Sequence, residues 1–203
     1  MTNSATTLVW KKLVLQGKDI VTSDEIRRLA GDLGKDESRS LRYLQEHGHI
    51  RRILRGVFYV ETPEERTRGS LGHSVLQLVQ MALEAKGVRR WYFGLETALK
   101  LNGMTHEYFA VDFVITDSFR TTKVIEILGN KFQFLRRAKG HFESGIVRRS
   151  GLVFSDPEKT VLDLAYKRMI DGHERQHVSS ALLEHADKID RAKARRYLTS
   201  YPP

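Results

Sequence analysis

The chain has 203 residues and a formal net charge of +9, from 34 lysine and arginine against 25 aspartate and glutamate side chains. It contains no cysteine, which excludes disulfides, thiol catalysis and cysteine-ligated zinc or iron–sulfur sites. It has no apolar run of about 18 residues and no secretory signal pattern, so we expect a cytoplasmic protein without a membrane span. The basic balance favours polyanionic partners, with nucleic acid first among them.

The first 62 residues predict three helices followed by a β-hairpin. The helices are expected over 6–16, from 22 to about 33 and from 36 to about 47, and the hairpin over 50–60. Thr22 and Glu25 have capping-box spacing at the start of the second helix, and Asp36 can cap the third. The Arg55-Gly56 pair can supply the turn between two short apolar strands. We therefore place a first domain at residues 1–62, with the element order of a winged helix-turn-helix.

The third helix and the hairpin carry the candidate DNA contacts. Arg39 and Arg42 lie three positions apart and share one helix face, opposite the apolar Leu41 and Leu44. In the major groove that face would meet base edges and specify sequence, while the hairpin arginines would hold phosphates as a wing. The candidate residues for binding double-stranded DNA are Lys35, Ser38, Arg39, Arg42, Tyr43, Arg51, Arg52 and Arg55. The alternative is a small helical domain with a solvated basic face, as in protein-interaction modules.

Residues 63–203 predict a second domain of mixed α+β character, joined to the first by the polar segment 61–69. Predicted helices cover 71–85, 96–101, 155–166, 176–187 and 190–199; predicted strands cover 91–94, 108–116, 124–128, 131–135, 146–147 and 152–154. The fold class is therefore α+β, an N-terminal winged helix-turn-helix followed by a mixed α+β domain. A second basic stretch over 131–150 is either a solvated sheet face or an extension of a nucleic-acid footprint.

Six segments of the chain resemble AbiEi-type antitoxins, the antitoxin and autorepressor members of type IV toxin–antitoxin systems. They are 22–30 (TSDEIRRLA), 40–44 (SLRYL), 48–60 (GHIRRILRGVFYV), 94–105, 112–116 and 155–164, within roughly residues 20–170. The resemblance implies repression of the protein's own operon and protection against a nucleotidyltransferase-like toxin, without a need for direct contact between the two proteins. A plain transcription factor without a toxin partner is the alternative. The oligomeric state, including a homodimer on DNA, stays open.

Residues 173–177 read His-Glu-Arg-Gln-His, the HExxH spacing that places two zinc ligands on one helix face with Glu174 as base. Gly172 directly precedes the motif, so it lies at a helix start rather than inside an apolar helix. Ser180 and Leu183 occupy the last two defined positions of the extended zinc motif, which therefore fails. We interpret the motif as solvated surface, and a metal-dependent hydrolase is the alternative.

Other catalytic constellations are incomplete. A nucleotidyltransferase needs two carboxylates on one strand to hold Mg²⁺, but Asp112 is followed two residues later by Val114. A nuclease could use Asp112 and Glu126, yet Leu128 stands where a lysine would be useful. Glycine-rich phosphate loops are absent. The sequence therefore predicts a protein that is not an enzyme, with no catalytic residues, metal ligands or cofactor.

Overall fold

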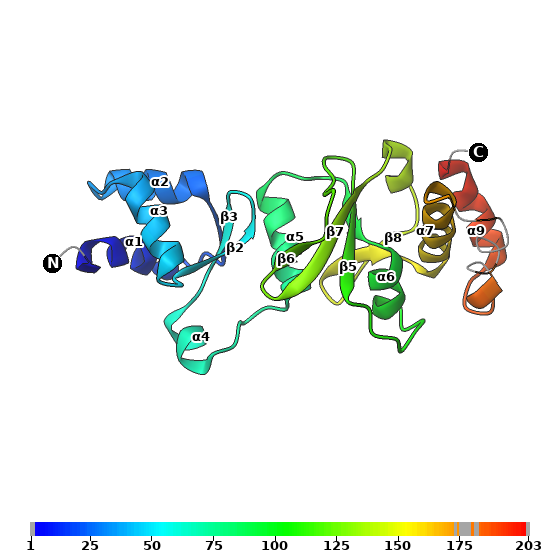
Figure 1. Cartoon of the computed structure of the whole chain (residues 1–203), viewed down its shortest axis with the longest axis horizontal. Coiled ribbons are helices and arrows are strands. Elements are labelled where there is room, and N and C mark those ends of the chain that lie inside the picture. The colour runs from blue at the N-terminus through cyan, green and yellow to red at the C-terminus, as the bar shows by residue number, and fades with distance from the viewer. Residues whose placement is uncertain (1–2, 173, 175–179, 181–182, 202–203) are drawn as a thin grey trace. The chain divides into compact units, whose positions relative to one another are not determined.

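The computed structural model describes residues 3–172, 174, 180 and 183–201. The chain divides into two compact units, residues 1–89 (unit 1) and residues 90–203 (unit 2). Both units combine helices with a β-sheet, so the protein is of mixed α+β class (Figure 1). Across the described ranges, no helix combines the length and the apolar character needed to cross a bilayer.

Unit 1 contains the three helices and the hairpin predicted for the first 62 residues, and these predictions are confirmed. Its elements are α1 (Asn3–Leu15), β1 (Ile20–Thr22), α2 (Ser23–Asp32), α3 (Glu37–Glu46), β2 (Ile50–Leu54), β3 (Val57–Val60), α4 (Pro63–Arg68) and α5 (Val75–Ala85). The strands form an antiparallel sheet in the order β1-β3-β2. Thr22 caps α2 through the predicted capping box with Glu25. Strand β1 was not predicted, because three residues give too little pattern.

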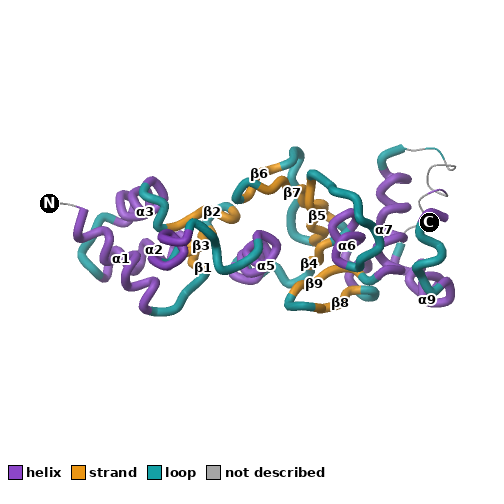
Figure 2. Tube along the Cα trace, turned by 90° about the horizontal axis from the view of Figure 1, so that it is seen from below, coloured by secondary structure: helices purple, strands orange, loops and turns teal. Residues whose placement is uncertain are grey.

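The sheet of unit 1 is covered on both faces. Phe58 and Val60 belong to the core formed with α1, α2 and α3, so the alternating Val57 and Tyr59 point to the other face. Helix α5 contacts all three strands, lies beside them in Figure 2, and covers that second face. All four residues of β3 are consequently buried.

The segment predicted as a linker is instead helix α4, held to unit 1. Thr62 and Glu65 form a capping box at its start, and the buried Glu65 also accepts hydrogen bonds from the Tyr59 hydroxyl and the Gly72 amide. Arg66 donates to the His47 carbonyl oxygen at 3.1 Å. The division between the units therefore falls after residue 89 rather than after residue 62, because α4 and α5 complete the first unit.

Unit 2 is built on a six-stranded mixed sheet in the order β6-β7-β5-β4-β9-β8. Its elements are β4 (Trp91–Phe93), α6 (Leu95–Leu101), β5 (Val111–Thr116), β6 (Ile125–Ile127), β7 (Asn130–Arg136), the 3-10 helix η1 (Lys139–Phe142), β8 (Ile146–Arg149), β9 (Leu152–Ser155), α7 (Pro157–Ile170), α9 (Arg191–Tyr197) and the 3-10 helix η2 (Leu198–Ser200). Strands β5 and β7 pair in parallel, as do β4 and β9. Helices α6 and α7 pack on each other and on β9, around a core that includes Tyr92, Leu99 and Val161.

The last helical segment is tied to α7 by buried polar groups. The Tyr201 hydroxyl donates to the Asp163 carboxylate at 2.6 Å, and the Tyr197 hydroxyl donates to Asp156 at 2.9 Å. Lys159 is 1% exposed and lies 3.4 Å from the same Asp163 carboxylate, which also accepts from the Tyr92 hydroxyl. The helix predicted over 190–199 is confirmed as α9 and η2, whereas the one predicted over 176–187 lies largely outside the described residues.

Candidate nucleic-acid interface

Helix α3 presents one polar face to solvent. Asp36 caps it by accepting a hydrogen bond from the Arg39 amide at 2.7 Å. Ser40 and Leu44 are buried against the rest of unit 1, so the opposite face is exposed. Ser38, Arg39 and Arg42 all lie on that exposed face, as the helical spacing predicts.

The arginines of this face are not neutralised within the fold. Neither Arg39 nor Arg42 forms an ion pair with any residue that the structure describes. Lys35 is half-buried in the turn before α3. Tyr43 is also half-buried and stacks on His47, with ring centroids 3.9 Å apart, so its ring is held by the protein itself. Arg39 and Arg42, the two basic side chains of α3, therefore carry charges that no described acid balances.

A shallow cleft of about 410 Å³ runs along the same face. Its lining combines Arg27 of α2 with five residues of α3, which are the half-buried Leu41 and the exposed Ser38, Arg42, Gln45 and Glu46. The sequence analysis did not predict Arg27, although it stands at an exposed position two residues after Glu25 of the α2 capping box. The cleft thus joins α2 to the exposed face of α3.

The hairpin arginines divide into one paired residue and two free ones. Arg51 makes a two-pronged ion pair with Glu61, with Nε to Oε2 at 2.7 Å and Nη2 to Oε1 at 2.9 Å. The hydrogen bonds that Arg51 donates to the Glu61 carboxylate raise the pKa of Arg51. Arg52 and Arg55 are exposed and have no ion-pair partner in the described part of the chain. Gly56, with φ +75°, lets the turn place Arg55 at its tip.

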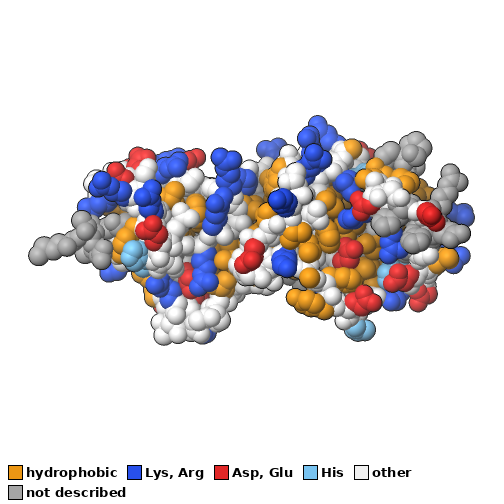
Figure 3. Space-filling view, viewed as in Figure 1, with side chains coloured by type: hydrophobic (Ala, Val, Ile, Leu, Met, Phe, Trp, Pro, Cys, Tyr) orange, Lys and Arg blue, Asp and Glu red, His pale blue; other side chains and the backbone are white. Residues whose placement is uncertain are grey.

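Unit 1 therefore exposes cations on two elements, α3 and the hairpin. Lys and Arg side chains project over α2, α3 and the hairpin in the space-filling view (Figure 3). Of the residues predicted from the sequence, Ser38, Arg39 and Arg42 share the α3 face, and Arg52 and Arg55 lie at the hairpin. Lys35, Tyr43 and Arg51 are partly buried or already engaged by neighbouring groups. The arrangement can engage polyanions through side chains that need not break existing ion pairs.

The residues considered for enzyme chemistry lie elsewhere. Asp112 accepts hydrogen bonds from Thr97 Oγ1 and Lys100 Nζ, each at 3.0 Å, which ties α6 to β5. Within the described ranges, no three His, Asp or Glu side chains are close enough to hold a metal ion. His173 and His177 of the HExxH motif lie outside the described residues.

Comparison with known proteins places the chain by fold rather than by family. No protein-family model matches the sequence, and no curated protein matches it at a significant level. The crystal structure of the RV2827C protein from Mycobacterium tuberculosis is similar, with a TM-score of 0.63 and 13% sequence identity over 98% of this chain and 72% of that one. At this identity the likeness concerns the fold alone. The chain is a mixed α+β protein that shares this fold.

Proposed function

We propose that unit 1 is a winged helix-turn-helix that binds double-stranded DNA. The observation that carries this proposal is the exposed face of α3, where Arg39 and Arg42 have no ion-pair partner among the described residues. The element order α1-β1-α2-α3-β2-β3 and the sheet order β1-β3-β2 support it, because α3 then follows α2 as a recognition helix and the hairpin follows as a wing.

In this proposal α3 enters the major groove. Arg39 and Arg42 would each offer a guanidinium fork to guanine O6 and N7, which is the commonest specific contact of this kind. Arg52 and Arg55 would bind backbone phosphates, which fix position without reading sequence. Arg51 would keep the hairpin in place through Glu61 instead of contacting DNA.

The test begins with selection of bound sites from random duplexes by the full-length protein. Arg39→Ala and Arg42→Ala should then narrow the gap in affinity between the selected site and a scrambled duplex, by about 1–3 kcal/mol for each lost bidentate contact. Arg52→Ala and Arg55→Ala should weaken both duplexes alike and lower the salt dependence by about one unit per contact. Arg68→Ala, which removes an exposed arginine of α4, is the matched control. An unchanged specificity ratio in both α3 variants would refute the recognition-helix assignment.

We further propose that the protein represses its own operon and counters a nucleotidyltransferase-like toxin. This step rests on the resemblance of the six segments to AbiEi-type antitoxins, and it requires no enzyme activity of this chain. The test first asks whether a nucleotidyltransferase-like gene lies beside the gene for this protein, and then measures growth of cells that express that gene with and without the full-length protein. Rescue of growth is expected. Repression of a reporter from the operon promoter without any rescue would instead favour a plain transcription factor.

A further inference from the structure

Unit 2 has two adjoining recesses where the parallel strands β5 and β7 end. They measure about 510 and 390 Å³, and both are lined by Arg120, Arg136 and Arg137. We call these two recesses the arginine cleft. Parallel strands bring their carboxyl ends to one edge of a sheet, and ligands of open α/β sheets bind outside that edge. The cleft thus lies at the carboxyl ends of two parallel strands, a place where ligand sites are common.

The fold holds these arginines in place. The Thr121 amide donates to the Phe134 carbonyl at 3.0 Å, and the Phe119 ring stacks on the Phe134 ring at 5.1 Å, so the loop that carries Arg120 is fixed along β7. Arg136 Nε donates to the Asp117 carbonyl oxygen at 3.1 Å. Arg137 Nη1 donates to the Arg136 carbonyl oxygen, also at 3.1 Å. The cleft is therefore pre-organised.

The charge of the cleft is not balanced by its own acids. No ion pair involves Arg120, Arg136 or Arg137 in the part of the chain that the structure describes. The two lining carboxylates are engaged by other cations, since Asp117 pairs with Arg90 at 3.5 Å and Asp171 pairs with Lys167. Three guanidinium groups are thus left with donors that a ligand can use.

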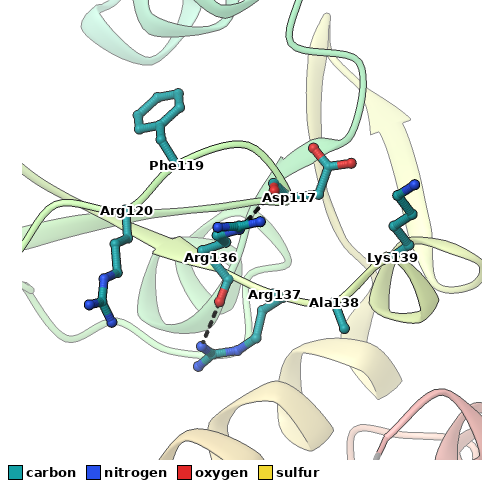
Figure 4. A pocket seen from close by; sticks show the side chains of 7 residues that line it. All are labelled: Asp117, Phe119, Arg120, Arg136, Arg137, Ala138 and Lys139. Carbon is teal, nitrogen blue, oxygen red and sulfur yellow. Dashed lines mark hydrogen bonds between the residues drawn. The ribbon is translucent and has the colours of Figure 1, made fainter.

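The side chains of Arg120 and Arg137 also point to a common ligand position. Figure 4 shows the guanidinium groups of Arg120 and Arg137 on the same side of the strand end, whereas the Arg136 guanidinium is turned toward Asp117 and Phe119 is directed away. Arg137 is half-buried, and its guanidinium lies 5.6 Å from the centre of the Tyr166 ring. A guanidinium fork matches the oxygens of phosphate, and several forks together match more than one phosphate group.

We propose that the arginine cleft binds a small anion with linked phosphate groups, the chemistry shared by inorganic pyrophosphate and nucleoside polyphosphates. Recesses of this size suit small molecules, which commonly occupy cavities of about 300–1,000 Å³. A nucleic-acid strand is favoured less, because part of the lining is recessed: Arg137 is half-buried and the second recess includes Leu135. A bound polyanion also relieves the repulsion among the three arginines, so it stabilises the folded protein.

The experiment measures binding of pyrophosphate and of ATP to the full-length protein by calorimetry, with thermal unfolding in parallel. Both probes should raise the unfolding temperature, and Arg120→Gln and Arg137→Gln should each weaken binding by about tenfold or more, since hydrogen bonds to charged groups are lost. Lys131→Gln removes one exposed charge from the other end of β7 and should leave binding unchanged. If ATP binds more tightly than pyrophosphate, the ligand is a nucleotide. If pyrophosphate binds as tightly as ATP or more tightly, the linked phosphates alone are recognised. Either result supports the proposal.

A second measurement does not depend on the folding of variants. Side-chain NMR signals of the arginine Nε–H groups in the wild-type protein should shift on addition of pyrophosphate, with the shifted signals assigned to the cleft. Absence of binding at millimolar probe, or affinity that is unchanged in both arginine variants, would overturn the proposal. So would a short single-stranded RNA that shifts these signals when neither small anion does.

Discussion

The ion pair between Arg51 and Glu61 stabilises the hairpin because one of its partners is almost completely buried. Glu61 is 3% exposed, and both of its carboxylate oxygens accept from the Arg51 guanidinium. Arg51→Ala would leave this carboxylate buried without its partner. We expect a loss of about 1–3 kcal/mol in the free energy of unfolding, measured by urea denaturation.

The neighbouring arginine provides the control for this prediction. Arg52 is exposed and pairs with no described acid, so Arg52→Ala should change the free energy of unfolding by less than about 0.5 kcal/mol. DNA affinity should respond in the opposite order, with the larger loss in Arg52→Ala. Equal stability of the two variants would show that the Glu61 carboxylate is solvated after all.

His141 makes the stability of unit 2 dependent on pH. Its side chain is 2% exposed, Nε2 has no hydrogen-bond partner among the described residues, and the ring packs on Tyr166 and Tyr201. Burial, and then the charge of Lys159, lower the pKa of His141 below its usual 6.5. As pH falls through about 6.5, the unfolded chain gains a proton at this site before the folded chain does, so stability decreases with falling pH.

The variant His141→Phe tests this dependence. It keeps an aromatic ring between the two tyrosines but removes the titration, so its stability should fall less than that of the wild type between about pH 7 and pH 5. The slope is the measured quantity, because loss of the hydrogen bond to the Ser200 backbone can change the absolute stability. His49, whose pKa is also lowered by burial, keeps its own contribution in both proteins. Identical slopes would contradict the prediction.

Among the elements, α9 and η2 are attached to α7 partly by side-chain hydroxyls, beside the ion pairs of Lys193 with Asp156 and Glu158. Tyr201→Phe removes the donor to Asp163 and leaves that buried carboxylate with less compensation. We expect a loss of about 1–2 kcal/mol in the free energy of unfolding. Tyr108 is 90% exposed, so Tyr108→Phe is the matched control and should leave stability unchanged. Faster hydrogen exchange of the α9 amides in Tyr201→Phe would localise the effect, and unaltered exchange and stability would refute it.

The elements also show what the sequence could predict. The predictions of α2 and α3 were right because Thr22, Glu25 and Asp36 are local caps whose effect depends on neighbouring residues alone. The same capping spacing at Thr62 and Glu65 could have predicted α4, but Pro63 and the polar composition favoured a linker. Local signals were therefore sufficient for helices, provided that composition did not outweigh them.

Contacts between distant residues could not be predicted in this way. The pairing of Arg51 with Glu61 depends on the approach of the chain after β3 to β2. The arginine cleft exists because β5 and β7 pair in parallel, which brings the loop after one strand beside the end of the other. Charge patterns identified basic segments, whereas the fold decided which cations keep their donors free.

At the scale of the whole molecule, the division after residue 89 predicts how the chain can be cut. A fragment of residues 1–89 should unfold cooperatively and keep the DNA affinity proposed for unit 1, because α4 and α5 are included. A fragment of residues 1–62 should expose Val57 and Tyr59 and aggregate or unfold. Circular dichroism, thermal melts and duplex titration compare the two. A stable, DNA-binding 1–62 fragment would show that α5 is dispensable for this sheet.

The covering of the sheet by α5 has a consequence for synthesis on the ribosome. A nascent chain that has emerged as far as Thr62 already carries every side chain proposed to contact DNA, yet the second face of its sheet is bare. The 23 residues from Pro63 to Ala85 must follow before that face is closed. At about 5–20 residues per second this takes about 1–5 s. During that interval the exposed sheet is a target for chaperones, so the emerging chain should gain the DNA affinity proposed for unit 1 only after α5 has been translated.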